Sequence, residues 1–173
     1  MNLMTGIVLY AVISKHLGLQ LRWPGKQEFY DCLYNIIDTE LLADGMYWVA
    51  TTPNAVNEAY NISNGDFFRW NQVWPSIASF FDMEIGPVQT LPLKEVMLDK
   101  EAIWSEIVRT YDLQNYTLAE LTNWDYLDMA LGNGYDQMSS ITKIRQAGWN
   151  NSLDTETTIT NQIQKLRDIN IIP

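Results

Sequence analysis

The sequence predicts a predominantly helical chain with two or three short strands. Two observations support this class: apolar residues recur at helical spacing in most of the chain, and residues 57–83 form a strand–turn–helix unit typical of α/β proteins. With 173 residues and 47% hydrophobic content, the chain is long enough for one domain with its own core. No repeat or linker interrupts it, so we expect a single domain over residues 1–173.

The stretch from residue 57 to residue 83 carries the most information. We predict a strand at residues 59–62 and a polar turn at residues 63–66, where Asn64-Gly65 supplies a positive-φ position. Asp66 is expected to cap the backbone N–H groups that follow. The helix after the turn has its apolar side chains on one face, namely Trp70, Trp74, Ile77 and Phe81.

Further helices follow from periodicity and end signals, and Leu19–Trp23 is expected to be a short extended segment. In the second predicted helix, Asp38 or Thr39 is the cap, and Leu41, Leu42, Tyr47 and Trp48 face inward. A capping box, Thr117-Leu-Ala-Glu120, opens a helix with a kink near Asn123. The remaining predicted helices cover residues 2–16, ending at Gly18, and then 38–51, 92–111, 117–131, 139–147 and 155–168.

The charge and the single cysteine exclude several classes of partner. A net charge of −10 disfavours nucleic acid and anionic membranes, because both are bound through Lys and Arg. The apolar N-terminus is too short to span a bilayer and lacks the basic region of a secretion signal. One cysteine cannot form an internal disulfide. We therefore expect a cytoplasmic protein with no nucleic-acid or membrane partner.

The residues alone reveal no catalytic, cofactor-binding or metal-binding constellation. No glycine-rich phosphate loop is present, and one histidine with one cysteine rules out an ordinary zinc site. His16 is expected to complement the dipole at a helix end, and Cys32 to be an inert core residue. Asp125 and Asp128 share a helix face, where they either line a pocket or, as we favour, cap or remain solvated.

The same residues carry a resemblance to a known family. The longest matching motif is Asn57-Glu58-Ala59-Tyr60-Asn61-x-Ser63-Asn64-Gly65-Asp66-x-Phe68-x-Trp70-x-x-x-Trp74. The other matching motifs are Tyr10-Ala11-x-Ile13-x-Lys15-His16-x-Gly18-Leu19, Leu21-Arg22-Trp23-Pro24-Gly25, Lys143-x-x-Gln146-Ala147-Gly148-Trp149 and Ile171-Ile172-Pro173. Over essentially all 173 residues the chain resembles the C-terminal half of the progesterone 5β-reductase/iridoid synthase-like (PRISE) enzymes, which are atypical extended short-chain dehydrogenases/reductases.

This resemblance implies an α/β ancestry and a role in substrate binding. In such enzymes an N-terminal Rossmann domain carries the NADPH motif and the catalytic tyrosine and lysine, and the C-terminal half shapes the pocket for an enone-like substrate. This chain resembles only the second half and contains no Tyr-x-x-x-Lys, so the Rossmann domain is expected to be absent. Alone, the chain is then expected to bind no NADPH and to reduce nothing.

Position by position, the resemblance places four residues in the substrate pocket. Met1 and Asn2 are expected near the nicotinamide, and Tyr126 and Ala130 on the helix that covers the pocket. Tyr126 is alternatively a plain core residue. Asp66 and its neighbours are expected to be architectural, with a ligand role for Asp66 as the alternative.

Three functional hypotheses remain open. In the first, the chain is the substrate-binding half of a reductase, whose missing domain leaves an apolar surface and an unpaired strand edge near residues 59–62; its partner is a second copy or a separate Rossmann chain. In the second, the chain is a non-catalytic helical binding module, and a relationship to NDP-sugar epimerases or dehydratases is a further alternative. The third, which we disfavour, is a distinct enzyme that uses Asp125, Asp128 and His16.

Overall fold

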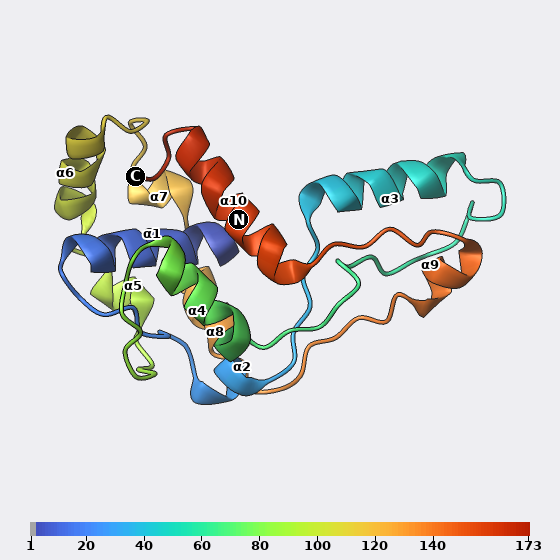
Figure 1. The fold of residues 1–173 in the computed structure, drawn as a ribbon, viewed down its shortest axis with the longest axis horizontal. Helices are drawn as coiled ribbons and strands as arrows, with labels where there is room; N and C mark the ends of the chain where they lie inside the picture. The colour runs from blue at the N-terminus through green and yellow to red at the C-terminus, as the bar shows by residue number, and fades with distance from the viewer. Residues whose placement is uncertain (1–2) are drawn as a thin grey trace.

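The computed structural model describes residues 3–173, which form ten α-helices and no β-strand (Figure 1). The helices are α1 (Leu3–His16), α2 (Gln27–Asp31), α3 (Thr39–Thr51), α4 (Trp70–Phe80), α5 (Leu93–Val96), α6 (Glu101–Tyr111), α7 (Leu118–Leu121), α8 (Trp124–Leu131), α9 (Thr142–Ala147) and α10 (Thr155–Asp168). Extended pairing in the described chain is limited to three isolated bridges, Leu21–Ile85, Tyr34–Phe68 and Tyr34–Gln137.

The molecule has two regions of unequal size. Figure 1 shows α3 and α9 set apart from the other helices at the end of long connecting segments. We call α3, α9 and their connecting loops the extension, and the remaining helices the helical body. The extension has its own small core, made by Leu41, Ile141, Ile144 and Trp149. Gly45 allows close packing there, because a Cβ atom at this position would lie 2.8 Å from Ile62 Cδ1.

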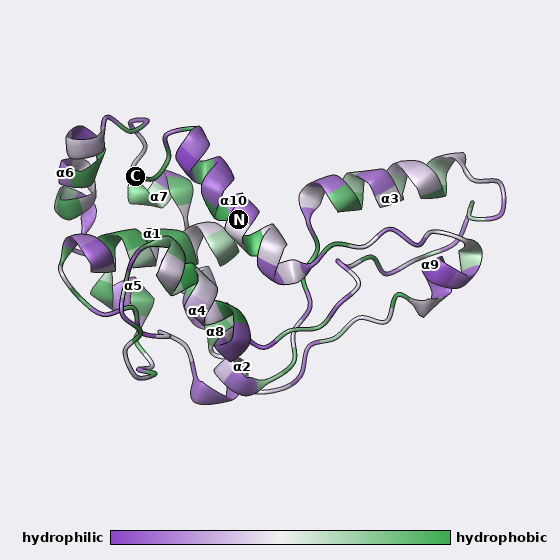
Figure 2. Ribbon diagram, in the orientation of Figure 1, coloured by the Kyte–Doolittle hydropathy of each residue, from purple (hydrophilic) through white to green (hydrophobic). Residues whose placement is uncertain are grey.

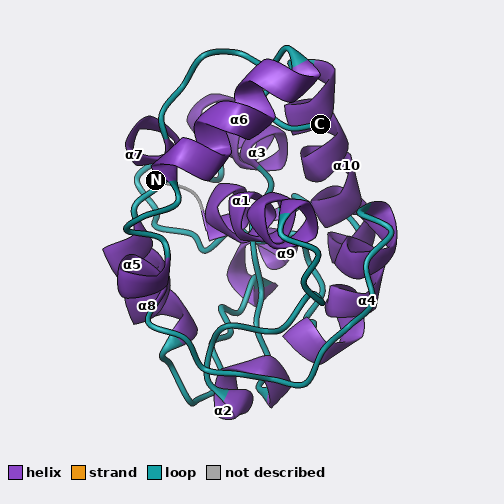
Figure 3. Ribbon diagram, turned by 90° about the vertical axis from the view of Figure 1, so that its left-hand side faces the viewer, coloured by secondary structure: helices purple, strands orange, loops and turns teal. Residues whose placement is uncertain are grey.

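Helix α1 is the centre of the helical body. Figure 3 shows α6, α8, α4 and α10 arranged around it, and the hydropathy colouring in Figure 2 shows α1 to be largely apolar while α10 is mixed. Ile7, Val8, Leu9 and Ala11 have no exposed surface, which confirms that this helix is buried on more than one side. None of the helices within residues 3–173 combines the length and hydrophobicity needed to cross a membrane.

Several helix predictions are confirmed. Asp38 caps α3 by accepting hydrogen bonds from Glu40 N and Leu41 N, and the Thr117–Glu120 capping box opens α7. Helix α10 has the predicted bounds, and α4 buries Trp70, Trp74 and Ile77.

Other boundaries and orientations differ from the predictions. The predicted helix at residues 92–111 is two helices, because a turn follows α5 in which Met97 is buried and Lys100 N donates to Met97 O. The kink near Asn123 is a break, because the Asn123 side chain accepts a hydrogen bond from Tyr126 N and starts α8. Tyr47 is 71% exposed rather than inward, since α3 contacts the rest of the chain along a narrow face only.

The predicted strand at residues 59–62 is wrong. This segment is irregular, and side chains rather than a neighbouring strand occupy its surroundings: Lys143 Nζ donates to Ala59 O, and Asn61 donates to Ser140 O. An extended segment becomes a strand only when a second one pairs with it, and none does so within residues 3–173. The segment at residues 19–23, expected to be extended, is not helical; Leu21 forms a bridge with Ile85, and Trp23 O accepts from Gln89 N.

Candidate functional site

A groove of ≈ 550 Å³ lies where the helical body meets the extension. The body contributes the start of α1, Trp70 at the start of α4, and Tyr126 on α8. Residues 34–37 and Ile62, which lead toward the extension, form another wall. None of the described residues that line this groove carries a charged side chain. The site therefore suits an uncharged, largely apolar small molecule.

Tyr34 is held in the groove wall through both its backbone and its ring. Its backbone exchanges two hydrogen bonds with Phe68, at 2.8 Å and 2.9 Å, and Gln137 N donates to the neighbouring Leu33 O at 2.8 Å. Its ring packs edge-on against Phe29, with centroids 5.3 Å apart, and against Phe68, 5.9 Å apart. Contacts on both the backbone and the ring fix the direction of this side chain.

Trp70 connects the groove to the aromatic core of the helical body. Its ring lies 5.2 Å from Trp23 and 5.2 Å from Phe68 between centroids, and the residue has no exposed surface. Its indole Nε1–H nevertheless has no hydrogen-bond acceptor among the described residues. Buried indole N–H groups usually find a partner, as Trp104 does in Tyr116 O at 2.7 Å.

Tyr126 enters the groove from the first turn of α8. Its backbone N–H is capped by Asn123 at 3.0 Å, and the side chain is half-buried. Burial raises the pKa of Tyr34, and the nearby Tyr126 phenol raises it further. Tyr34 therefore keeps its proton at neutral pH.

A polar junction beside the groove joins the extension to the helical body. Asn64 is fully buried; its side chain accepts a hydrogen bond from Asp38 N at 2.8 Å and donates to Thr155 Oγ1 at 3.1 Å. Gly65 takes the predicted positive φ of 106°. Asp66 caps α10 by accepting from Thr155 N at 2.8 Å, so the prediction that it caps the segment that follows it is wrong.

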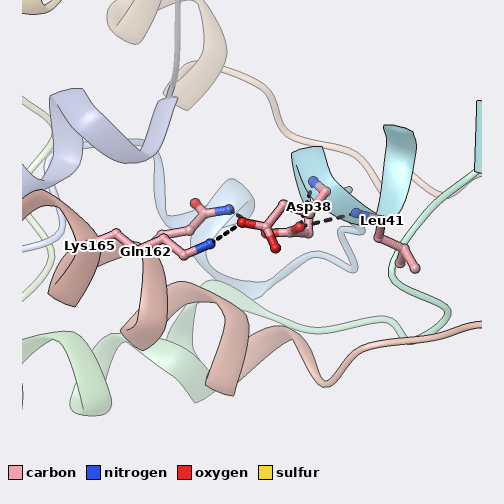
Figure 4. Close-up of polar contacts among 5 residues, drawn as sticks. Asp38, Leu41, Gln162 and Lys165 are labelled. Atoms are coloured by element: carbon pink, nitrogen blue, oxygen red, sulfur yellow. Dashed lines mark hydrogen bonds and ion pairs between the residues drawn. The ribbon is translucent and has the colours of Figure 1, made fainter. Parts of the chain in front are cut away.

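Asp38 links the same junction to α10. Figure 4 shows the side chains of Gln162 and Lys165 reaching from α10 toward Asp38 at the start of α3. Burial favours the neutral form of this carboxyl, but hydrogen bonds from Leu41 N, Gln162 and Glu40 N and the charge of Lys165 outweigh it. The pKa of Asp38 is therefore lowered, and the carboxylate is the stable form in the folded protein.

Of the four residues predicted for the substrate pocket, the structure describes two, Tyr126 and Ala130. Tyr126 lines the groove. Ala130 is half-buried one turn later on α8 and is not among the residues that line the groove. Met1 and Asn2 lie outside the described residues. Their roles in substrate binding stay predictions.

The remaining candidates are not gathered into one site. Asp128 caps α5 through Leu93 N and Lys94 N, as favoured, while Asp125 pairs with Lys94 at 2.7 Å beside a separate hollow of ≈ 700 Å³. His16 lies at the end of α1, with Nε2 4.0 Å from Glu106. Cys32 is buried, and burial raises its thiol pKa, which fits an inert residue. No group of three or more metal-ligating side chains occurs within residues 3–173.

Tyr34 is the residue that sequence reasoning missed. It lies in a stretch without helical or strand periodicity, and its neighbours Phe68 and Gln137 come from distant parts of the chain. The only signal available was an aromatic residue in an otherwise unassigned segment.

The chain is homologous over its whole length to part of several plant enzymes, although no protein-family model matches it. It is 35% identical over 176 residues to (S)-8-oxocitronellyl enol synthase of Antirrhinum majus and 31% identical over 177 residues to the enzyme of that name from Catharanthus roseus. It is also 31% identical over 176 residues to 3-oxo-Delta(4,5)-steroid 5-beta-reductase of Arabidopsis thaliana. In each case the match covers 100% of this chain and 45% of the relative, so the chain spans about half the length of these proteins.

Proposed function

We propose, from the membership of this chain in the progesterone 5β-reductase/iridoid synthase-like (PRISE) family as a partial segment, that it is the substrate-binding half of an NADPH-dependent reductase. Its substrate would carry a C=C or C=O bond activated as in an enone. The observation that carries the proposal is the homology over 100% of the chain to 45% of each relative. The corresponding half would be the C-terminal one.

The groove supports the assignment to substrate binding. It forms within this chain, it has no charged lining, and its volume of ≈ 550 Å³ falls in the range of small-molecule sites. The name of the Arabidopsis relative describes a steroid whose ketone is conjugated to a double bond. Such a molecule is apolar apart from its oxygen atoms, which matches the character of this lining.

The cofactor would be bound elsewhere. A dinucleotide pyrophosphate is held by a glycine-rich turn between a strand and a helix. Residues 3–173 contain no strand and supply no such turn, so they do not fit NADPH. We therefore propose that a Rossmann domain outside this chain, for example one in a partner chain, contributes NADPH and the catalytic tyrosine and lysine.

Two alternatives are distinguished by the same groove. A non-catalytic binding module would bind its ligand without any second domain. Because this chain alone forms the groove, the groove is compatible with that alternative. An NDP-sugar epimerase or dehydratase relationship is disfavoured, because no Lys or Arg among the described lining residues is available to bind a diphosphate.

A reconstitution experiment tests the proposal. The purified chain is mixed with the part of the Antirrhinum enzyme that precedes the homologous segment, and complex formation is followed by gel filtration. NADPH absorbance is then followed with 4-phenyl-3-buten-2-one as the enone; each half alone is the control. We expect a complex and ketone-dependent NADPH oxidation only in the mixture. A soluble chain that forms no complex with the other half, together with no NADPH oxidation in the mixture, would contradict the proposal.

A further inference from the structure

We propose that a cavity at the C-terminal end of α1 is a second small-molecule site, which binds an organic carboxylate with an apolar body. The cavity has a volume of ≈ 350 Å³ and is lined by α1, α6, α10, Phe81 at the end of α4, and Pro173. It shares no described lining residue with the groove, which lies at the other end of α1, about 18 Å away at a helical rise of about 1.5 Å per residue. The proposal therefore does not depend on the reductase role.

The charged side chains in the described lining of this cavity are all basic. They are Lys15 and His16 in the last turn of α1 and Arg167 in the last turn of α10. No Asp or Glu is among the described lining residues, although the chain has 21 acidic residues against 11 Lys and Arg. When an α-carboxylate at Pro173, the last residue of the sequence, is counted, two cations and a titratable imidazole still face one anion. The cavity therefore favours an anionic ligand.

Two acidic residues approach these cations from outside the cavity. Asp82 lies 3.9 Å from Lys15 and Glu106 lies 4.0 Å from His16, and neither acidic residue lines the cavity. Their side chains are 93% and 58% exposed. Both distances exceed the length of a hydrogen bond, and exposed ion pairs of this kind contribute little free energy. A ligand carboxylate can therefore compete with them for Lys15 and His16.

Arg167 is held in a geometry that suits the recognition of a carboxylate. Its guanidinium stacks over the Phe80 ring, with Cζ 4.3 Å from the ring centroid, and its Nε donates to Pro173 O at 2.7 Å. These contacts fix the plane of the guanidinium and use one of its five N–H donors. Within residues 3–173 neither Nη group donates a hydrogen bond. Two adjacent Nη–H groups match the two oxygen atoms of a carboxylate.

The helix ends do not occupy these basic side chains. A basic residue in the last turn of a helix can bond the carbonyl groups that remain free there. Backbone groups already do so here, because Gly18 N donates to Lys15 O and Asn170 N donates to Arg167 O, both at 2.9 Å. The Lys15, His16 and Arg167 side chains donate to no carbonyl of α1 or α10. Their N–H groups therefore remain available to a ligand.

The rest of the lining determines the body of the ligand. Val12, Phe81 and Ile107 are each at most 4% exposed, and they give the cavity an apolar wall beside its cations. The volume of ≈ 350 Å³ lies within the range of small-molecule sites. An inorganic anion such as phosphate would leave this apolar wall in water, whereas an aryl carboxylate would cover it.

Two probes that differ in charge test this site. Binding of 3-phenylpropanoate and of its neutral analogue 3-phenylpropanamide to the purified chain is measured by ligand-detected NMR titration. We expect the chain to prefer the carboxylate. Arg167→Gln should weaken carboxylate binding by about tenfold or more, the effect of a charged hydrogen bond, and Lys15→Gln by about two- to fivefold. Neither substitution should change binding of the amide.

A matched variant separates this site from a general effect of charge. Arg109 is exposed in the last turn of α6 and does not line the cavity, so Arg109→Gln removes one positive charge and should bind as the wild type does. Thermal melts verify that each variant is folded. The Lys15 side chain is 50% exposed, so Lys15→Gln tests the site even if Arg167→Gln does not fold.

Several results would overturn the proposal. A wild type that binds both probes equally, or binds neither, contradicts a carboxylate site. Carboxylate binding that survives both Arg167→Gln and Lys15→Gln, or that falls equally in Arg109→Gln, contradicts this location. Inorganic phosphate that binds as tightly as 3-phenylpropanoate contradicts the apolar body of the ligand. None of these results depends on NADPH or on reconstitution with a second domain, so a failed reconstitution leaves the test intact.

Discussion

The helical body and the extension bury apolar side chains on very different scales. In the body, α1 is enclosed by other helices, and four tryptophans, Trp23, Trp70, Trp74 and Trp104, are 1% exposed or less. In the extension, the core cluster contains only four buried side chains, with partly buried ones around them, and α3 leaves Met46 and Tyr47 in solvent. We therefore expect the body to be stabilised mainly by its own core and the extension to rely more on the polar junction at Asn64 and Asp38. The groove lies between them, so its shape depends on both.

Trp74→Ala should have the largest effect, because it removes the centre of the body core. The Trp74 ring is fully buried and lies 5.0 Å from Trp23 between centroids. We expect a loss of about 3–5 kcal/mol in the free energy of unfolding, measured by urea denaturation. Leu98 is 83% exposed, and Leu98→Ala is the matched control that should leave the free energy almost unchanged. A small loss in Trp74→Ala would show that the body does not depend on this core.

Ile144→Ala tests whether the extension unfolds separately. Ile144 is fully buried, but its cluster is small, so we expect a loss near the lower end for such changes, about 2 kcal/mol. Hydrogen exchange should show faster exchange in α9 while the α1 amides stay protected. Equal acceleration in both helices would instead make the two regions one cooperative unit.

Asn64→Ala tests the junction itself. It leaves Asp38 N–H and Thr155 Oγ1 without their Asn64 partner, and we expect a loss of about 1–3 kcal/mol. Asn61→Ala is the control, because Asn61 is exposed and makes one long hydrogen bond of 3.3 Å to Ser140 O. Urea denaturation of both variants gives the comparison. Equal effects would mean that the junction contributes nothing beyond a surface contact.

The smallest expected effect is the pH dependence of the Asp38 contribution. The folded-state pKa of Asp38 is lowered, so its carboxylate stabilises the fold above the unfolded-state value of about 3.9. That stabilisation is lost as pH falls through the lower folded-state pKa. Asp38→Asn keeps a side-chain oxygen for capping but does not titrate. The gap in unfolding free energy between wild type and this variant should therefore shrink below about pH 4, as measured by denaturation across pH.

Helices were predictable where their signals are local. Thr117 and Glu120 lie three residues apart, and the apolar stripe of α10 is within one segment, so sequence reasoning found both elements. The break between α5 and α6 was not predictable, because the residues between them, 97–100, include no glycine or proline to signal the end of a helix. Residues 59–62 have strand-like composition, but the partner that would make them a strand is missing from the described chain.

The candidate site also contains one residue that could be predicted from the sequence and others that could not. Tyr126 was found through family resemblance, which places a residue without knowing its contacts. Tyr34 was not found, because its position depends on bridges to Phe68 and Gln137 and on Asp136, which accepts from Leu33 N across 103 residues. Asp66 was assigned to the wrong helix, since a cap at a chain-distant N-terminus leaves no local pattern.

The Asn64 junction also sets an order of assembly for the polypeptide. Its two side-chain hydrogen bonds join residues that are 26 and 91 positions apart in sequence. During synthesis α1, α3 and α4 are complete long before Thr155 has been made. The extension therefore acquires its final attachment only when α10 leaves the ribosome, and until then the groove has one unfinished wall. A chain interrupted before residue 155 would lack the Thr155 end of this junction and the Gln162 part of the groove lining.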